Sequence, residues 1–323
     1  MRMLPKISSL VASTVLAIGV ATSAQAEEFK VGLLTGGSAT ESGWNKIAYD
    51  ALMRTRDELG AEVSFVELDH NPASYEKAFL DFADQDYDIV IGHGFEFQDA
   101  AMSVAPDYPD TTFLITSSFE YNDNMVGITL TPFQPFYLMG VLAAHRGNKA
   151  GYIGGMKIPP IEFALKGFTA GAKSVNPDFE VLSVFIGNFS DSAAVKEAAI
   201  TMIANGATMI VPNADSAALG AFQAVSEAKT DVVAFGAFAD FTESAPKQIL
   251  GNYVPDFGQG IVEVAQQIRD GDFNPGHNIV FGLESDTVLK ITFNENASQP
   301  VTSEERAALD KAKAGLISGE IPQ

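Results

Sequence analysis

The sequence predicts an α/β protein of two doubly wound parallel-sheet lobes, joined by a hinge that the chain crosses several times. Short apolar strands alternate with amphipathic helices along most of the 323 residues, as in sheets built from right-handed strand–helix–strand units. The alternation is interrupted at 126–140 and resumes at 151–155, which divides the strands into two sets. A second irregularity, at 251–255, indicates that the chain crosses back between the lobes.

The individual elements follow from hydrophobic periodicity. Short apolar runs that end in small residues are the predicted strands: 31–35, 89–91, 126–130, 152–153, 184–186, 209–211 and 233–235. Apolar residues at helical spacing predict the helices: 44–59, 73–82, 98–105, 160–172, 192–204, 216–228 and 258–269. Gly60 is expected to end the first helix as a C-cap. We expect about four or five strands in each lobe.

Two segments near the breaks and the end of the chain need their own interpretation. The aromatic cluster at 133–137 follows Thr131 and Pro132, and we interpret it as packing within the hinge. Near the end of the chain, Thr302 and Glu305 have the spacing of a capping box, which predicts a final helix that ends near Gly315.

The N-terminal segment has the features of a cleaved signal peptide. Arg2 and Lys6 precede an apolar stretch, 7–20, that is too short to span a bilayer comfortably, so an uncleaved anchor is the weaker alternative. The small residues at 24–26 predict cleavage after Ala26 and export to the periplasm. The sequence contains no cysteine, so there is no residue for lipid attachment at this boundary and no disulfide.

These breaks define the expected domain organisation. Residues 1–26 form the signal peptide, 27–148 the N-terminal α/β lobe and 149–250 the C-terminal α/β lobe. Residues 251–323 are expected to supply hinge crossings and C-terminal elements shared between the lobes.

Charge and motif content restrict the function. The net charge is −21, and loss of the two basic residues of the signal takes it to −23, which argues against nucleic acid or an anionic membrane surface as partner. The sequence has no Walker loop, no dinucleotide fingerprint, no HExxH and, with four histidines and no cysteine, no metal cluster of usual spacing. We therefore expect a binding protein without cofactor or metal, and not an enzyme.

The ends of the predicted strands suggest a binding site. Carboxyl ends of parallel strands face one crevice, where ligands bind. Trp44, the only tryptophan, follows a glycine at the start of a helix, and Phe189 has an equivalent place in the other lobe. Two aromatic rings from opposite lobes could enclose a flat ring by stacking. The alternative for Trp44 is an ordinary place in the core.

Polar residues at the same strand ends complete the candidate site. Asn45 and Asn213 can donate and accept hydrogen bonds, whereas the carboxylates of Asp215 and Asp240 can only accept them. The alternative for the two aspartates is that they cap helices. His93 is either a loop residue or part of the pocket. Lysines are scarce at these positions and arginines are absent, so a phosphate or carboxylate ligand would be poorly held. We expect a neutral, flat ligand.

The chain resembles the basic membrane protein group of bacterial substrate-binding proteins, the purine nucleoside receptor type, whose fold is that of type I periplasmic binding proteins. The resemblance covers about 30–293, and its matching blocks are 43–49 (GWNKIAY), 152–159 (YIGGMKIP), 187–191 (GNFSD) and 234–240 (AFGAFAD). The Gly-Gly-Met-x-Ile-Pro motif in the second block is the most specific of these.

The resemblance implies that a purine nucleoside or free base is captured for an ABC permease. It implies stacking of the base between Trp44 and Phe189, a ligand contact from Asn45 and an acidic contact to ribose from Asp240. Residues 213–216 resemble a His-x-Asp-Ser block of base-binding relatives.

Two departures from the family pattern weaken the case for a whole nucleoside and leave a free base, or another neutral heterocycle, open. Ser117 occupies the position of a usual aspartate, and a lysine of the nucleoside receptors falls near Pro255. A secreted sensor domain, a flavin-binding protein and a nucleoside hydrolase remain as alternatives.

Overall fold

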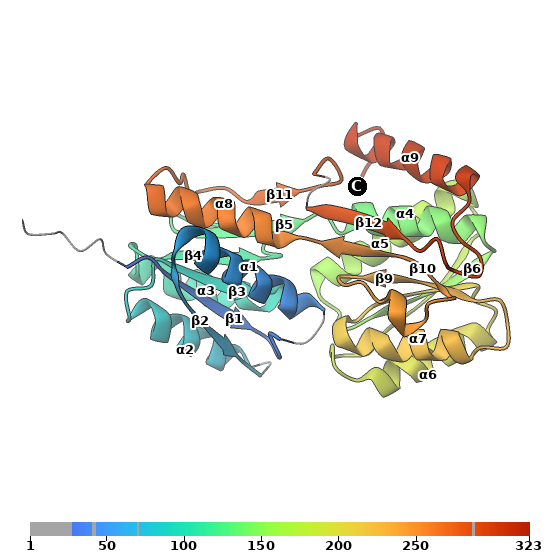
Figure 1. Ribbon diagram of the computed structural model, residues 1–323, viewed down its shortest axis with the longest axis horizontal. Coiled ribbons are helices and arrows are strands. Elements are labelled where there is room, and N and C mark those ends of the chain that lie inside the picture. The colour runs from blue at the N-terminus through green and yellow to red at the C-terminus, as the bar shows by residue number, and fades with distance from the viewer. Residues whose placement is uncertain (1–27, 41–42, 70, 286–287) are drawn as a thin grey trace, which may run out of the picture.

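The computed structural model describes residues 28–40, 43–69, 71–285 and 288–323. The expected signal peptide therefore lies outside the described residues. Within the described part of the chain, no helix combines the length and the apolar character needed to cross a membrane. Figure 1 shows two lobes side by side, each with a sheet and flanking helices, so the prediction of two parallel-sheet lobes is confirmed.

The N-terminal lobe contains a six-stranded parallel sheet in the order β11-β5-β4-β3-β1-β2. Its strands are β1 (Lys30–Thr35), β2 (Glu62–Glu67), β3 (Ile89–His93), β4 (Thr112–Thr116), β5 (Met125–Leu130) and β11 (Ile279–Phe281). The central strands are buried on both faces, as expected for a parallel sheet covered by helices. Their carboxyl ends all point toward the other lobe.

The C-terminal lobe repeats this plan with the order β12-β10-β9-β8-β6-β7. Its strands are β6 (Lys149–Gly154), β7 (Glu180–Phe185), β8 (Met209–Asn213), β9 (Val233–Ala237), β10 (Ile249–Pro255) and β12 (Leu289–Phe293). Only β12 runs antiparallel to its neighbour. Each described sheet thus has six strands, one or two more than expected, because one strand of each comes from the last fifth of the chain.

Helices cover both sheets. In the first lobe these are α1 (Trp44–Leu59), α2 (Pro72–Ala83), α3 (Gln98–Val104) and α8 (Phe257–Asp270), and α8 packs beside α1. The second lobe has α4 (Phe133–His145), α5 (Pro159–Val175), α6 (Ser192–Ala204), α7 (Ala218–Glu227) and α9 (Ser303–Ile317). Gly60 adopts the left-handed conformation with φ of 68°, which confirms the expected C-cap of α1.

Helix α4 differs from the sequence interpretation. The aromatic cluster that we interpreted as hinge packing is its first turns, and residues 133–143 are all buried. A helix that is apolar all round has no amphipathic period, so its pattern could not distinguish it from a packed linker. Close approach to α5 explains the glycines, since a Cβ at Gly140 would overlap the carbonyl oxygen of Phe168, and one at Gly171 that of Tyr137.

The chain passes between the lobes at three places among the described elements. These connections join β5 to α4, β10 to α8 and β11 to β12. Because α4 packs on α5 in the second lobe, the first crossing lies near Thr131 and Pro132, ahead of the boundary expected at residue 148. Several connecting segments between two lobes form a common hinge, about which the lobes can move apart.

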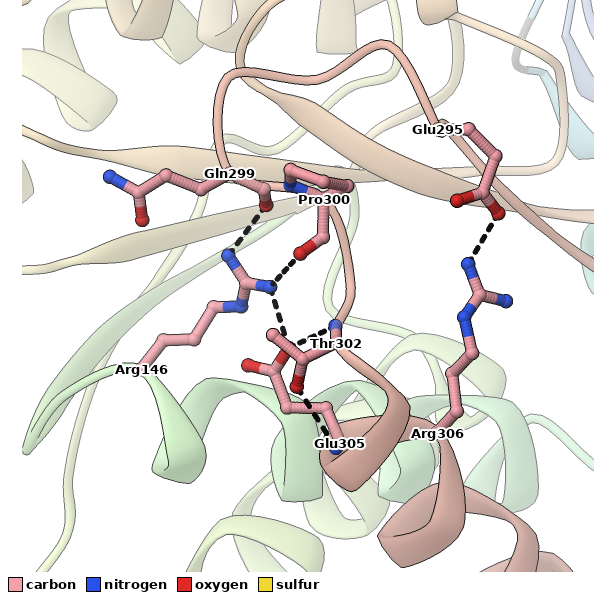
Figure 2. A network of polar contacts seen from close by, with 7 residues as sticks. All are labelled: Arg146, Glu295, Gln299, Pro300, Thr302, Glu305 and Arg306. Carbon is pink, nitrogen blue, oxygen red and sulfur yellow. Dashed lines mark hydrogen bonds and ion pairs between the residues drawn. The ribbon is translucent and has the colours of Figure 1, made fainter.

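The last helix is fixed to the second lobe by a polar network (Figure 2). Arg146, at the end of α4, donates to the carbonyl oxygens of Gln299 and Pro300 and to Glu305 Oε2 at 2.8 Å. Glu305 also accepts from the Thr302 N–H, while Thr302 Oγ1 accepts from the Glu305 N–H. This confirms the predicted capping box, and the helix ends at Ile317, two residues beyond the expected Gly315.

Candidate ligand-binding site

A cavity lies between the lobes, at the carboxyl ends of both sheets. It contains about 810 Å³ of empty space, part of it open to solvent. Residues from both lobes and from the hinge line it: Gly36, Trp44, Asn45, Gly94, Phe95, Glu96, Ser117, Thr129, Leu130, Pro132, Ile158, Pro160, Ile161, Phe189, Asn213, Asp215, Phe238 and Tyr253. This is the crevice in which open α/β sheets bind ligands.

Trp44 is held from three sides and still lines the cavity. Its ring stacks on His93 with a centroid distance of 4.3 Å, and it meets Phe238 and Phe257 edge to face at 5.2 Å each. This packing fixes the orientation of the indole in the wall of the cavity. Phe189 lines the cavity from the second lobe. Aromatic rings are thus presented from both lobes, as the sequence predicted.

Polar groups in the cavity are held by fixed partners. Asn213, at the end of β8, donates from Nδ2 to the Tyr152 hydroxyl at 2.9 Å, and that hydroxyl donates to the Ile161 carbonyl at 2.8 Å. The side chain of Asn213 is therefore oriented before a ligand arrives. Ser117, with φ of 62°, and Asn45 also lie in the cavity wall.

Asp215 connects the two lobes. Its Oδ1 accepts a hydrogen bond of 2.7 Å from the backbone N–H of Trp44, the first residue of α1 in the other lobe. The carboxylate thus satisfies one of the free N–H groups at a helix N-terminus, where the helix dipole also favours a negative charge. A Cβ on Gly43, which has φ of 115°, would overlap this same carboxylate. In this structure Asp215 therefore joins the second lobe to the start of α1 in the first.

Two residues of the predicted site do not reach the cavity lining. His93 is fully buried beneath Trp44, where Nε2 donates to the Trp44 carbonyl and Nδ1 accepts from Thr116 Oγ1, both at 2.9 Å. Burial lowers its pKa to about 3, so the ring is neutral and supports the tryptophan. Asp240 is exposed, and its Oδ1 accepts from the Thr242 N–H and from Asn252 Nδ2.

The sequence analysis missed several cavity residues, and Glu96 is the most consequential. It follows the glycine and aromatic residue at the end of β3, the same kind of strand end that singled out Trp44, so a signal was present. Burial raises the pKa of Glu96 to about 7, and the negative charge of Asp215 adds to this shift. Phe238, directly after β9, and Tyr253, on β10, were also missed, because an aromatic residue in or beside a strand is usually part of the core.

The raised pKa of Glu96 predicts a pH dependence of stability. Between the unfolded-state pKa of 4.5 and the folded-state pKa of about 7, the folded protein binds more protons than the unfolded chain, so the unfolding free energy should fall as pH rises through this window. Glu96→Gln removes the buried charge. We expect its melting temperature to exceed that of the wild type by a few degrees at pH 8 and to match it near pH 4.

The control for this measurement is Glu76→Gln, because Glu76 is an exposed glutamate on α2. It should melt with the wild type at every pH. A melting-temperature difference between Glu96→Gln and wild type that stays constant from pH 4 to pH 8 would contradict the assignment.

No group of three or more histidine, cysteine, aspartate or glutamate side chains with the geometry of a metal site occurs among the described residues. The model of the ABC transporter substrate-binding protein PnrA-like family matches residues 29–321. The chain belongs to this family. Members of this family are substrate-binding proteins, so the chain is a binding protein and not an enzyme, as the sequence analysis inferred.

Individual relatives agree with the family assignment. The chain is 27% identical over 317 residues to a purine-binding protein of Brucella abortus, an alignment that covers 97% of this chain and 88% of the relative. It is 27% identical over 316 residues to an ABC transporter nucleoside-binding protein of Lactococcus lactis, covering 91% and 88%. It is also 25% identical to basic membrane protein A of Borreliella burgdorferi over 299 residues, covering 90% and 86%.

Solved structures support the fold. A solute-binding protein of an ABC transporter system from Aeropyrum pernix superposes with a TM-score of 0.81 at 22% identity, covering 91% of this chain and 92% of that one. A corresponding protein from Conexibacter woesei gives a TM-score of 0.73 at 26% identity, covering 91% and 98%. The two-lobed architecture of this PnrA-like protein is thus that of solute-binding proteins.

Proposed function

We propose that this PnrA-like protein captures a neutral purine between its lobes outside the cytoplasm and delivers it to the membrane permease of an ABC importer. The observation that carries the proposal is the composition of the cavity. Aromatic rings line it from both lobes, and hydrogen-bonding side chains lie between them. A flat heterocycle with polar edges matches this combination, since aromatic side chains can stack on its faces and polar side chains can form hydrogen bonds with the atoms at its edge.

Charge supports a neutral ligand. Glu96 and Asp215 both line the cavity, and its described lining residues include neither lysine nor arginine. An anionic group inside would face carboxylates without a balancing cation. The printed names of the Brucella and Lactococcus relatives, purine-binding and nucleoside-binding, are consistent with this class of ligand.

We favour a free base over a whole nucleoside. In the family resemblance the acidic residue at the Asp240 position contacts ribose. Here Asp240 is exposed and bonded to Asn252 and Thr242, away from the cavity lining. In the same resemblance, Ser117 occupies the position of a usual aspartate, and a lysine of the nucleoside receptors falls near Pro255. The groups that would hold a sugar are therefore reduced, whereas the stacking residues are retained.

Calorimetric titration with three classes of purine tests the proposal. We expect adenine, hypoxanthine or guanine to bind, their nucleosides to bind more weakly, and the 5′-monophosphates to give no heat, because the phosphate would be repelled by Glu96 and Asp215. Equal or tighter binding of a monophosphate would contradict the carboxylate-lined cavity. A protein that binds none of the purines, yet binds another neutral heterocycle such as riboflavin, would contradict the purine assignment.

A further inference from the structure

Tyr253 lines the cavity, and its buried hydroxyl is an unexplained polar group. Tyr253 is fully buried on β10, and among the described residues its hydroxyl has no hydrogen-bond partner. Tyr152, a buried tyrosine on the same sheet, differs in this respect, because its hydroxyl both donates to Ile161 and accepts from Asn213. The fold can therefore satisfy a buried tyrosine on this sheet, and it leaves Tyr253 unsatisfied.

A buried hydroxyl without a partner is costly. An unpaired hydroxyl in a protein interior has lost its hydrogen bonds to water without replacing them, so each instance in a native structure calls for an explanation. Phenylalanine would fill the same space without this cost. Burial also raises the pKa of Tyr253 well above its ordinary value, so the hydroxyl keeps its proton and remains a donor.

The position of Tyr253 connects this hydroxyl to the ligand. The ring lines the cavity, and it lies 5.4 Å from the ring of Phe238, which in turn lies 5.2 Å from the ring of Trp44. Tyr253 thus belongs to the same aromatic cluster as the proposed stacking residue. Strand β10 lies next to β9, and β9 next to β8, whose last residue Asn213 is the other fixed polar group on this side of the cavity.

We propose that Tyr253 is a specificity-determining residue, whose hydroxyl donates a hydrogen bond to an acceptor in the plane of the bound heterocycle. The acceptor is a ring nitrogen or an exocyclic oxygen, and Asn213 provides a second polar contact on the same side. This inference rests on the proposed function and goes beyond it by naming the residue that forms a hydrogen bond with the edge of the base. A site that hydrogen-bonds a particular ligand atom discriminates strongly against analogues without that atom.

Tyr253→Phe tests the proposal because the variant should lose affinity for the purine without losing stability in the absence of ligand. We expect the purine that binds the wild type most tightly to bind Tyr253→Phe about tenfold more weakly, while the ligand-free variant melts at the same or a higher temperature. Tyr152→Phe is the matched comparison and should melt at a lower temperature, because it removes a satisfied hydroxyl. Tyr121→Phe alters an exposed tyrosine and should leave affinity unchanged.

A series of deaza-purines identifies the acceptor. Replacing one ring nitrogen by carbon at a time should produce one analogue that binds the wild type weakly and shows no further loss in Tyr253→Phe, as expected when protein and ligand variants remove the same contact. If the contact is to an exocyclic oxygen, hypoxanthine should show the loss and unsubstituted purine should not. A wild-type affinity retained by Tyr253→Phe for every purine would overturn this inference and leave the proposed function intact. A wild type that binds no purine would overturn both.

Discussion

Trp44→Ala is expected to weaken purine binding about ten- to a hundredfold, because stacking of a base on an aromatic side chain contributes about 1–3 kcal/mol. The ring is held against His93, Phe238 and Phe257, so the alanine variant should also melt at a lower temperature. Trp44→Phe keeps an aromatic face and should lose less affinity than alanine. Phe189→Ala should lose a similar amount from the opposite lobe.

The single tryptophan also provides a direct readout of its role. Because Trp44 is the only tryptophan in the chain, its fluorescence emission should change when a purine stacks on it. Phe65→Ala is the control, since Phe65 is 40% exposed on β2 and away from the cavity lining, and it should bind as the wild type does. Unchanged affinity in a well-folded Trp44→Ala protein would remove the aromatic enclosure from the mechanism, and Trp44 would then be a core residue only.

Much of the fold could be predicted because local patterns determine it. Apolar strands that end in small residues and helices at a 3.6-residue period indicate alternating α/β structure without any knowledge of long-range contacts. Helix α4 escaped prediction because it is buried on every side, and the predicted strands did not include β2, β4, β10, β11 or β12. Of these strands, β2, β11 and β12 lie at the edges of the two sheets. Whether an edge strand joins a sheet depends on partners far away in the sequence.

The candidate site was predicted in part, for a related reason. The rule that strand ends converge brought Trp44, Asn45, Phe189, Asn213 and Asp215 to one cavity, and the structure places all five there, together with Ser117. The rule does not tell which side chain at a strand end points into the crevice. His93 instead turns under Trp44, and Asp240 bonds within its own lobe. Side-chain direction is decided by packing, which local sequence does not contain.

The contact between Asp215 and Trp44 could not be predicted at all, since it joins residues 171 positions apart across two lobes. Its existence predicts that Asp215 controls closure. Asp215→Ala should weaken purine binding about ten- to a hundredfold, because a hydrogen bond to a charged group is worth about 1.5–3 kcal/mol and this one forms only when the lobes meet. If a smaller fraction of the protein molecules is closed, the apparent affinity for the purine falls in proportion to that fraction.

Two further variants separate closure from direct ligand contact. Asp215→Asn keeps an acceptor oxygen and tolerates the φ of 50° at this position, so its loss of affinity should fall between that of the wild type and that of alanine. Asp240→Asn changes an exposed carboxylate outside the cavity lining and should bind normally.

Small-angle X-ray scattering of the ligand-free proteins provides the deciding measurement. If Asp215 holds the lobes together through the start of α1, Asp215→Ala should have a larger radius of gyration than the wild type, whereas a residue that only touches the ligand would leave the ligand-free shape unchanged. Gly43→Ala should open the lobes in the same way, because its Cβ would overlap the Asp215 carboxylate. An Asp215→Ala protein that stays as compact as the wild type and binds purine equally well would show that closure depends on the hinge and the ligand alone.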